Sequence, residues 1–231
     1  MTDEFGKALL EIYTKGKTKI KLILRRDNGK SEVRDLKKYL QPYENFEEIQ
    51  KNALKHAKGH VLDIGVGGGK HSLHLQKQGF KVTGIDNSPN LVKLCKKRGI
   101  KDIRLMNLFE MNFGKEKFDT VLLFGNGLSF GRNPSEMKKF LEKIYNLTTK
   151  EGIILGDSTN TRKTNRGLLA YKGRKQFKLR GETNGKVGPW FTPFFVSENQ
   201  LRKIIKETRW KISKMYYNKL GDRFSVVLEK R

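Results

Sequence analysis

Apolar runs and amphipathic stretches alternate along the middle of the chain. Between the runs, apolar residues recur at helical spacing, as at Met137, Phe140 and Ile144. The runs themselves are short, and several are continuous, as in strands buried inside a parallel sheet. They lie at residues 61–64, 81–85, 100–106, 118–124 and 152–156. Strands that alternate with helices predict an α/β fold with a mostly parallel sheet.

The two ends of the chain add elements of another kind. Residues 5–13 and 46–57 have helical spacing, and residues 19–24 alternate like a strand. Near the C-terminus, residues 210–217 and 223–228 predict two strands joined by a turn. We therefore expect a three-layer α/β fold on a seven-stranded mixed sheet that ends in an antiparallel hairpin.

The strongest motif follows the run at 61–64, where glycines separate a strand from a helix. Asp63 is followed by Gly65, Gly67 and two further glycines, and the next strand ends at Asp86. Glycines permit a tight turn and let a ligand approach the backbone closely. A dinucleotide fingerprint would need a third glycine at position 70, where the chain has Lys70. The spacing therefore argues against NAD.

An acid, an apolar residue, spaced glycines and a second acid in this order resemble the first motif of class I S-adenosylmethionine-dependent methyltransferases. The resemblance is to a small, substrate-unassigned branch with similar helices after the glycines and similar loops at 125–129. It implies a Rossmann-like fold and a methyltransferase activity with S-adenosylmethionine as cofactor. It also implies that Asp63 helps to hold the glycine loop and the methionine amine, and that Asp86 binds the ribose. The expected cofactor-binding residues are Asp63, Gly65, Val66, Gly67, Asp86, Asn87, Asn107, Leu108, Phe124 and Gly125.

Residues that could carry chemistry follow the predicted strands. Asn107 stands where the family often has an aspartate that bonds the adenine amino group, and its side-chain oxygen could accept the same bond more weakly. Asn126 follows the fourth strand, Asp157 the fifth, and His71 lies in the first turn of the cofactor helix. These last three are the catalytic candidates. No spacing of histidines or acids indicates a metal.

Three segments are expected. Residues 1–57 form an N-terminal cover of helices and a strand, and residues 58–231 form the methyltransferase domain. Residues 158–193 are an insertion after the fifth strand on the substrate side. The candidate substrate contacts are Tyr13, Arg26, Asn126, Tyr171 and Trp190.

Charge bears on the acceptor. The 231 residues carry a net charge of +25, and the excess is concentrated in the last third of the chain, although lysine is spread throughout. A polyanion, an anionic small molecule or merely a lysine-rich proteome would account for this. No apolar run approaches the length of a membrane span, no secretory signal is seen, and the single Cys95 favours a reducing compartment. We expect a cytoplasmic protein.

The sequence thus predicts in-line methyl transfer to a small, anionic or polar acceptor. One alternative is an RNA methyltransferase that uses the basic C-terminal third. The small molecule is favoured because that region lacks a known RNA-binding signature. A second alternative is a module that binds S-adenosylmethionine without turnover. The acceptor atom, the use of a general base and the oligomeric state stay open.

Overall fold

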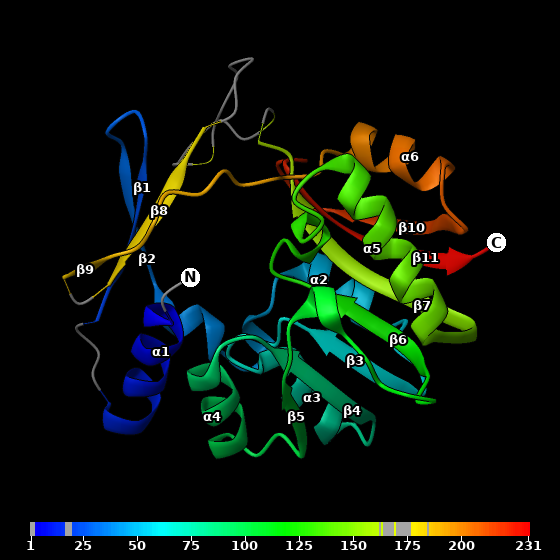
Figure 1. The fold of residues 1–231 in the computed structure, drawn as a ribbon, viewed down its shortest axis with the longest axis horizontal. Coiled ribbons are helices and arrows are strands. Elements are labelled where there is room, and N and C mark those ends of the chain that lie inside the picture. Colours follow the sequence, from blue (N-terminus) through cyan, green and yellow to red (C-terminus); the bar gives the residue numbers. More distant parts are fainter. Residues whose placement is uncertain (1–2, 17–19, 162, 164–168, 170–176, 184) are drawn as a thin grey trace.

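The computed structural model of the protein describes residues 3–16, 20–161, 163, 169, 177–183 and 185–231 (Figure 1). At its centre is a seven-stranded sheet in the order β10-β11-β7-β6-β3-β4-β5. Neighbours from β7 to β5 are parallel, and β11 is antiparallel to both β7 and β10. The strands are β3 (His60–Ile64), β4 (Lys81–Asp86), β5 (Asp102–Leu105), β6 (Phe118–Leu123), β7 (Thr148–Thr159), β10 (Trp210–Tyr217) and β11 (Arg223–Lys230). The predicted mixed sheet with its C-terminal hairpin is confirmed.

Helices cover both faces of this sheet, because successive residues of the central strands point to opposite faces and both sets are apolar. Residues such as Leu62 and Val121 pack with α5 and α6 in the larger buried cluster. Val61 and Leu122 pack on the other face with α2 and α3. The helices are α1 (Glu4–Lys15), α2 (Glu48–Leu54), α3 (Lys70–Lys77), α4 (Pro89–Lys97), α5 (Pro134–Leu147) and α6 (Glu198–Lys206). α1 lies beside α4, and both contribute to a third buried cluster (Figure 1).

Side-chain caps fix where the helices begin. Ser88 Oγ accepts a hydrogen bond from Leu91 N at 3.0 Å, and Asn133 Oδ1 accepts one from Glu136 N at 2.9 Å. Ser197 and Gln200 form a reciprocal capping box. Free backbone amides in a first turn are satisfied in this way. Ser88, Asn133 and Ser197 are therefore the N-caps of α4, α5 and α6.

A second, four-stranded antiparallel sheet joins segments that lie far apart in the sequence. Its order is β2-β1-β8-β9, with β1 (Leu22–Arg26), β2 (Ser31–Arg34), β8 (Leu179–Thr183) and β9 (Lys186–Val187). We call it the cap sheet; it stands to one side of the main sheet (Figure 1). Leu24 and Leu179 of the cap sheet pack with Phe195, which precedes α6. One strand of the N-terminal region therefore pairs with one strand from the region after β7.

Some predicted strand bounds differ from the structure. The fifth strand was expected to end before Asp157, but β7 continues to Thr159, because β11 pairs with it from Ile153 to Thr159. The strand expected at residues 19–24 is β1, which begins at Leu22 and continues to Arg26. Among the helices of the described residues, none has the length and apolarity required to cross a membrane.

Candidate functional site

The glycine loop between β3 and α3 is a tight bend. Gly65, Gly67 and Gly69 have φ values of 73°, 58° and 80°, in the left-handed region where a side chain is unfavourable. The amides of Gly65 and Val66 both donate to the carbonyl oxygen of Ile85, at 2.9 and 3.1 Å. These bonds tie the loop to the end of β4. The left-handed φ values explain why glycine stands at alternate positions here.

Asp86 ends β4 and faces the glycine loop. Its Oδ2 accepts a hydrogen bond from Gly67 N and its Oδ1 accepts one from Ser88 N, both at 3.0 Å. Burial raises the pKa of this carboxyl, while the amides of Gly67, Ser88 and Asn87 act in the opposite direction. A carboxylate has about four acceptor sites. Those beyond the two amide bonds remain for a ligand.

Asp63 lies inside β3 directly before the loop and is 3% exposed. The hydroxyl of Ser72, in the first turns of α3, donates to Asp63 Oδ2 at 2.7 Å. The pKa of Asp63 is raised to about 6, chiefly by burial; the Ser72 bonds act against the rise and the charge of Asp86 adds to it. A nearby positive charge on a ligand would therefore favour the ionised form of this buried acid.

Three other predicted cofactor positions lie at the same edge of the main sheet, where parallel strands end. Asn107 is exposed, and its Oδ1 accepts a hydrogen bond from Phe109 N at 3.0 Å as the cap of η3 (Leu108–Glu110). Phe124 is buried directly after β6, and Gly125 follows it with φ 73° in an exposed position. One acceptor site of Asn107 is thus already in use.

The loop after β6, residues 125–129, which we call the Asn126 loop, is held in place by a buried acid. Asp157 of β7 is fully buried, and its Oδ1 accepts a hydrogen bond from Asn126 N at 2.6 Å. Its Oδ2 accepts one from Gln50 Nε2 of α2 at 2.7 Å. Burial raises the pKa of Asp157, and Arg223 and these two bonds act against the rise. Since both carboxylate oxygens are engaged inside the protein, the geometry gives Asp157 a structural role in the loop and does not present it to an acceptor.

His71 and Lys70 approach the same amide. His71 Nε2 lies 3.4 Å from Gln50 Oε1, and Lys70 Nζ donates to that oxygen at 3.3 Å. The His71 ring packs against Phe46 and Phe124, with centroids 5.0 and 4.7 Å away. Burial holds the pKa of His71 well below its ordinary value. The imidazole is therefore neutral near pH 7.

Gln50 was not singled out in the sequence. It lies in an ordinary amphipathic helix, and no local motif distinguishes it from the other polar residues of that segment. What distinguishes it is its burial: the side chain is 3% exposed, which no local pattern predicts. Only the tertiary structure brings α2 against β7.

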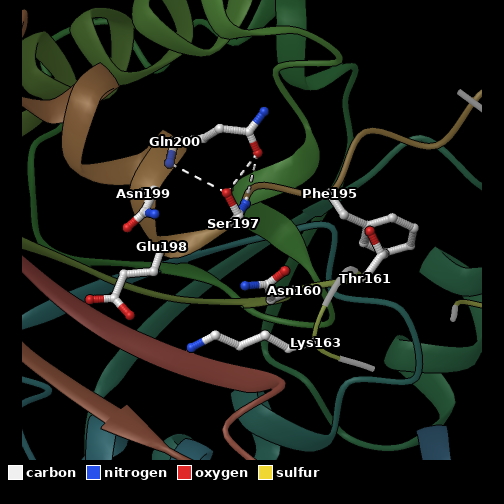
Figure 2. Close-up of a pocket in the computed structure, with 8 residues that line it drawn as sticks. All are labelled: Asn160, Thr161, Lys163, Phe195, Ser197, Glu198, Asn199 and Gln200. Carbon is white, nitrogen blue, oxygen red and sulfur yellow. Dashed lines mark hydrogen bonds between the residues drawn. The ribbon is translucent and has the colours of Figure 1, made fainter. Parts of the chain in front are cut away.

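A cavity of about 440 Å³ opens at the end of β7 (Figure 2). Asn160, Thr161 and Lys163 line one side, Phe195 another, and the first turn of α6 at residues 197–200 a third. Asn160 directly follows Thr159, whose Oγ1 is hydrogen-bonded to Asn126 Oδ1 at 2.9 Å. The cavity and the Asn126 loop are thus one residue apart along β7. Its lining is polar with one aromatic ring, and it includes the charges of Lys163 and Glu198.

The remaining predicted substrate contacts are not brought together. Tyr13 is exposed beside the end of α4, where its hydroxyl reaches Lys97 O at 3.5 Å. Arg26 is buried in the cap sheet, with its guanidinium 4.3 Å above the Phe177 ring. Trp190 is half exposed and stacks on Arg180, which lies on the opposite face of the cap sheet from Leu179. Tyr171 lies outside the described residues.

S-adenosylmethionine fits the groups at the glycine loop. Asp86 has acceptor sites for ribose hydroxyls, and Asp63 is a buried acid suited to a cationic amine. A Cβ added at Gly67 would meet no atom closer than 3.9 Å, so open space lies beside the loop. In the described residues, no group of three or more histidines, cysteines or acids could hold a metal ion.

Comparisons with known proteins point the same way. The family profile described as "Methyltransferase domain" matches residues 61–152. A solved structure of a SAM-dependent methyltransferase from Bacteroides fragilis, in complex with S-adenosyl-L-homocysteine, superposes with a TM-score of 0.85. It is 27% identical, and the alignment covers 99% of this chain and 94% of that one.

Curated relatives are more distant. A protein of Geobacillus sp. (strain WCH70), named as a candidate methyltransferase, is 28% identical over 130 residues, 53% of each chain. A glycine/sarcosine N-methyltransferase of Aphanothece halophytica is 24% identical over 116 residues, 48% of this chain and 44% of that protein. The chain therefore spans about half the length of the curated relatives that it matches.

Proposed function

We propose that this chain, a class I S-adenosylmethionine-dependent methyltransferase, transfers a methyl group to a small, anionic or polar acceptor. One observation supports this most. The glycine loop, Asp63 and Asp86 lie at the same sheet edge as a polar cavity at the end of β7. Ligands in open α/β sheets bind outside the carboxyl ends of the strands. Donor and acceptor would therefore meet near the Asn126 loop. A cytoplasmic location is part of the proposal, and the single, buried Cys95 is consistent with it.

The residues of this chain would act mainly by binding and orientation. When bound, S-adenosylmethionine supplies an electrophilic methyl group. Asp86 would hold the ribose and Asp63 the methionine amine. Gly67, beside which the space is open, would give the ligand room against the backbone. Holding two reactants in line contributes up to about 7–11 kcal/mol in favourable cases. A general base would be needed only for an acceptor that is protonated at working pH.

The lining of the cavity supports the class of acceptor. Lys163 supplies a positive charge that suits a carboxylate or phosphate. Glu198 is paired with Arg202 at 2.8 Å, and its remaining acceptor sites suit an amine. Asn160 and Thr161 add neutral hydrogen-bonding groups. Some distant relatives bear the name glycine/sarcosine N-methyltransferase. An amine that also carries a carboxylate is therefore the first acceptor class to test.

The proposal is tested by incubating the protein with methyl-labelled S-adenosylmethionine and panels of amino acids, other amines, phenols, carboxylates and bulk tRNA. We expect label in a small molecule that carries a negative charge, with S-adenosylhomocysteine formed in equal amount. Lys163→Ala should then raise the KM for that acceptor by about 2- to 5-fold, as for loss of one exposed ion pair. Lys219→Ala, which removes an exposed lysine in the β10–β11 turn, is the matched control and should leave the KM unchanged.

Label in tRNA alone, with binding that weakens steeply as salt is raised, would replace the small acceptor by RNA. Tight binding of S-adenosylmethionine with no label transferred to any panel would favour the binding module without turnover. A KM that is unaffected in Lys163→Ala would remove the cavity from the acceptor site.

A further inference from the structure

We infer that Gln50 is a positioning residue, whose side-chain amide couples the start of the cofactor helix α3 to the Asn126 loop. The inference deepens the proposed function and rests on it, because it assigns to the N-terminal cover a part in aligning donor and acceptor. No sequence pattern assigns this residue a role, and the proposal places it in contact with neither ligand.

The side-chain amide of Gln50 contacts two elements, β7 and α3. Its Nε2 donates to Asp157 Oδ2 at 2.7 Å, and its Oε1 accepts from Lys70 Nζ at 3.3 Å, with His71 Nε2 3.4 Å from the same oxygen. A carboxamide is a side chain that can donate to an acid and accept from a cation through the two ends of one rigid group. The side chain is 3% exposed, so water does not readily substitute for either bond.

Asp157 passes this constraint to the loop. Its other oxygen accepts from Asn126 N at 2.6 Å. Asn126 has φ 65°, in the left-handed region, which is unfavourable for a residue with a side chain. The bond to Asp157 offsets that cost, and the bond between Thr159 Oγ1 and Asn126 Oδ1 at 2.9 Å fixes the side chain. Loss of the Gln50 amide would leave Asp157 free to reorient and would loosen Asn126.

At the other end, the path reaches the cofactor. Lys70 is the first residue of α3 and directly follows Gly69 of the glycine loop. Burial lowers the pKa of Lys70 while the charge of Asp157 raises it, so Lys70 and Asp157 interact electrostatically across the Gln50 amide. A ligand that orders the glycine loop therefore also orders Lys70 and the Gln50 amide, which through Asp157 holds Asn126. The Gln50 amide would help to position both the methyl donor and the acceptor.

The test compares Gln50→Leu with Gln50→Glu. Leucine has a similar size and removes both bonds. Glutamate places a second carboxylate against Asp157, where the two oxygens can bond only if they share a proton. The other charged or titratable groups around this point are Lys70 and His71 of α3, Glu47 before α2, and Arg223 of β11, which pairs with Glu47.

Two readouts are needed. The first is amide hydrogen exchange of residues 125–129 in the ligand-free protein, which should be faster by about tenfold or more in Gln50→Leu. The second is the affinity for S-adenosylhomocysteine, expressed as the ratio of variant to wild type at each pH. For Gln50→Glu this ratio should be about 0.1 or less at pH 8 and should rise toward 1 near pH 5.5. For Gln50→Leu it should stay low throughout.

Asn52→Leu is the matched control, since Asn52 is an amide on the same helix whose Oδ1 accepts from Lys55 Nζ at 3.0 Å on the surface. It should leave both readouts at wild-type values. Unchanged exchange at 125–129 in Gln50→Leu, or a Gln50→Glu ratio independent of pH, would overturn the positioning role. If the wild type does not bind S-adenosylhomocysteine, the proposed function fails, and the exchange rates still decide whether Gln50 holds the loop.

Discussion

Replacing Asp86 with alanine is expected to weaken the binding of S-adenosylhomocysteine by about 10- to 150-fold. The proposed ligand donates its ribose hydroxyls to this carboxylate, and a hydrogen bond to a charged group contributes about 1.5–3 kcal/mol. The side chain is also the acceptor for Gly67 N and Ser88 N, at 3.0 Å each. Its removal therefore loosens the glycine loop as well as the ribose contact.

Titration calorimetry with two ligands separates these contributions. The loss caused by Asp86→Ala should be large for S-adenosylhomocysteine and small for its 2′,3′-dideoxy analogue, which lacks the hydroxyls. Asp102→Ala is the control, because Asp102 begins β5 at the amino end of the neighbouring strand and bonds to Thr83 and Arg104. Equal losses for both ligands would show that Asp86 acts only on the loop.

The affinity for S-adenosylhomocysteine is also expected to fall as the pH is lowered through about 6. The pKa of Asp63 is raised by burial to about 6. A ligand with a cationic amine binds the ionised carboxylate, so protonation of Asp63 opposes binding. Below this pH the affinity should fall by up to about tenfold per pH unit. In the ligand-free protein the same raised pKa has the opposite effect on the free energy of unfolding. The stability that protonated Asp63 contributes is complete below the unfolded pKa near 4 and is lost as the pH rises through about 6.

Calorimetric titrations from pH 7.5 to 5 check this expectation. Asp63→Asn keeps the shape and an acceptor for the Ser72 hydroxyl, but it cannot ionise. It should bind about tenfold more weakly than wild type at pH 7.5 and should lose most of the pH dependence. Asp86, whose pKa is also raised, accounts for any slope that remains. The same slope in wild type and Asp63→Asn would show that another group titrates.

Local patterns predicted the elements of the main sheet. Two signals depend only on residues close in sequence: the continuous apolar strands, and the glycines that require left-handed backbone. The positions of Asp63 and Asp86 at one edge followed from the rule that parallel strands end together. The terminal hairpin was equally local, because its two strands and its turn are contiguous.

Features that depend on contacts between distant segments were not predicted. The length of β7 is set by pairing with β11, about 70 residues later. The cap sheet pairs Leu22 with Thr183, and no periodicity in either segment specifies its partner. Gln50 was missed for the same reason, since a buried glutamine has the same local pattern as an exposed one. Asp157, a catalytic candidate expected just after the fifth strand, lies inside β7 because the strand extends past it, and it is buried.

The most direct measurement is titration of the wild-type protein with S-adenosylmethionine, S-adenosylhomocysteine and NAD under identical conditions. We expect one molecule of either adenosyl sulfur compound to bind per chain, with NAD giving no heat of binding. Saturable binding of NAD, or no binding of both sulfur compounds to a protein shown to be folded, would contradict the assignment of the glycine loop.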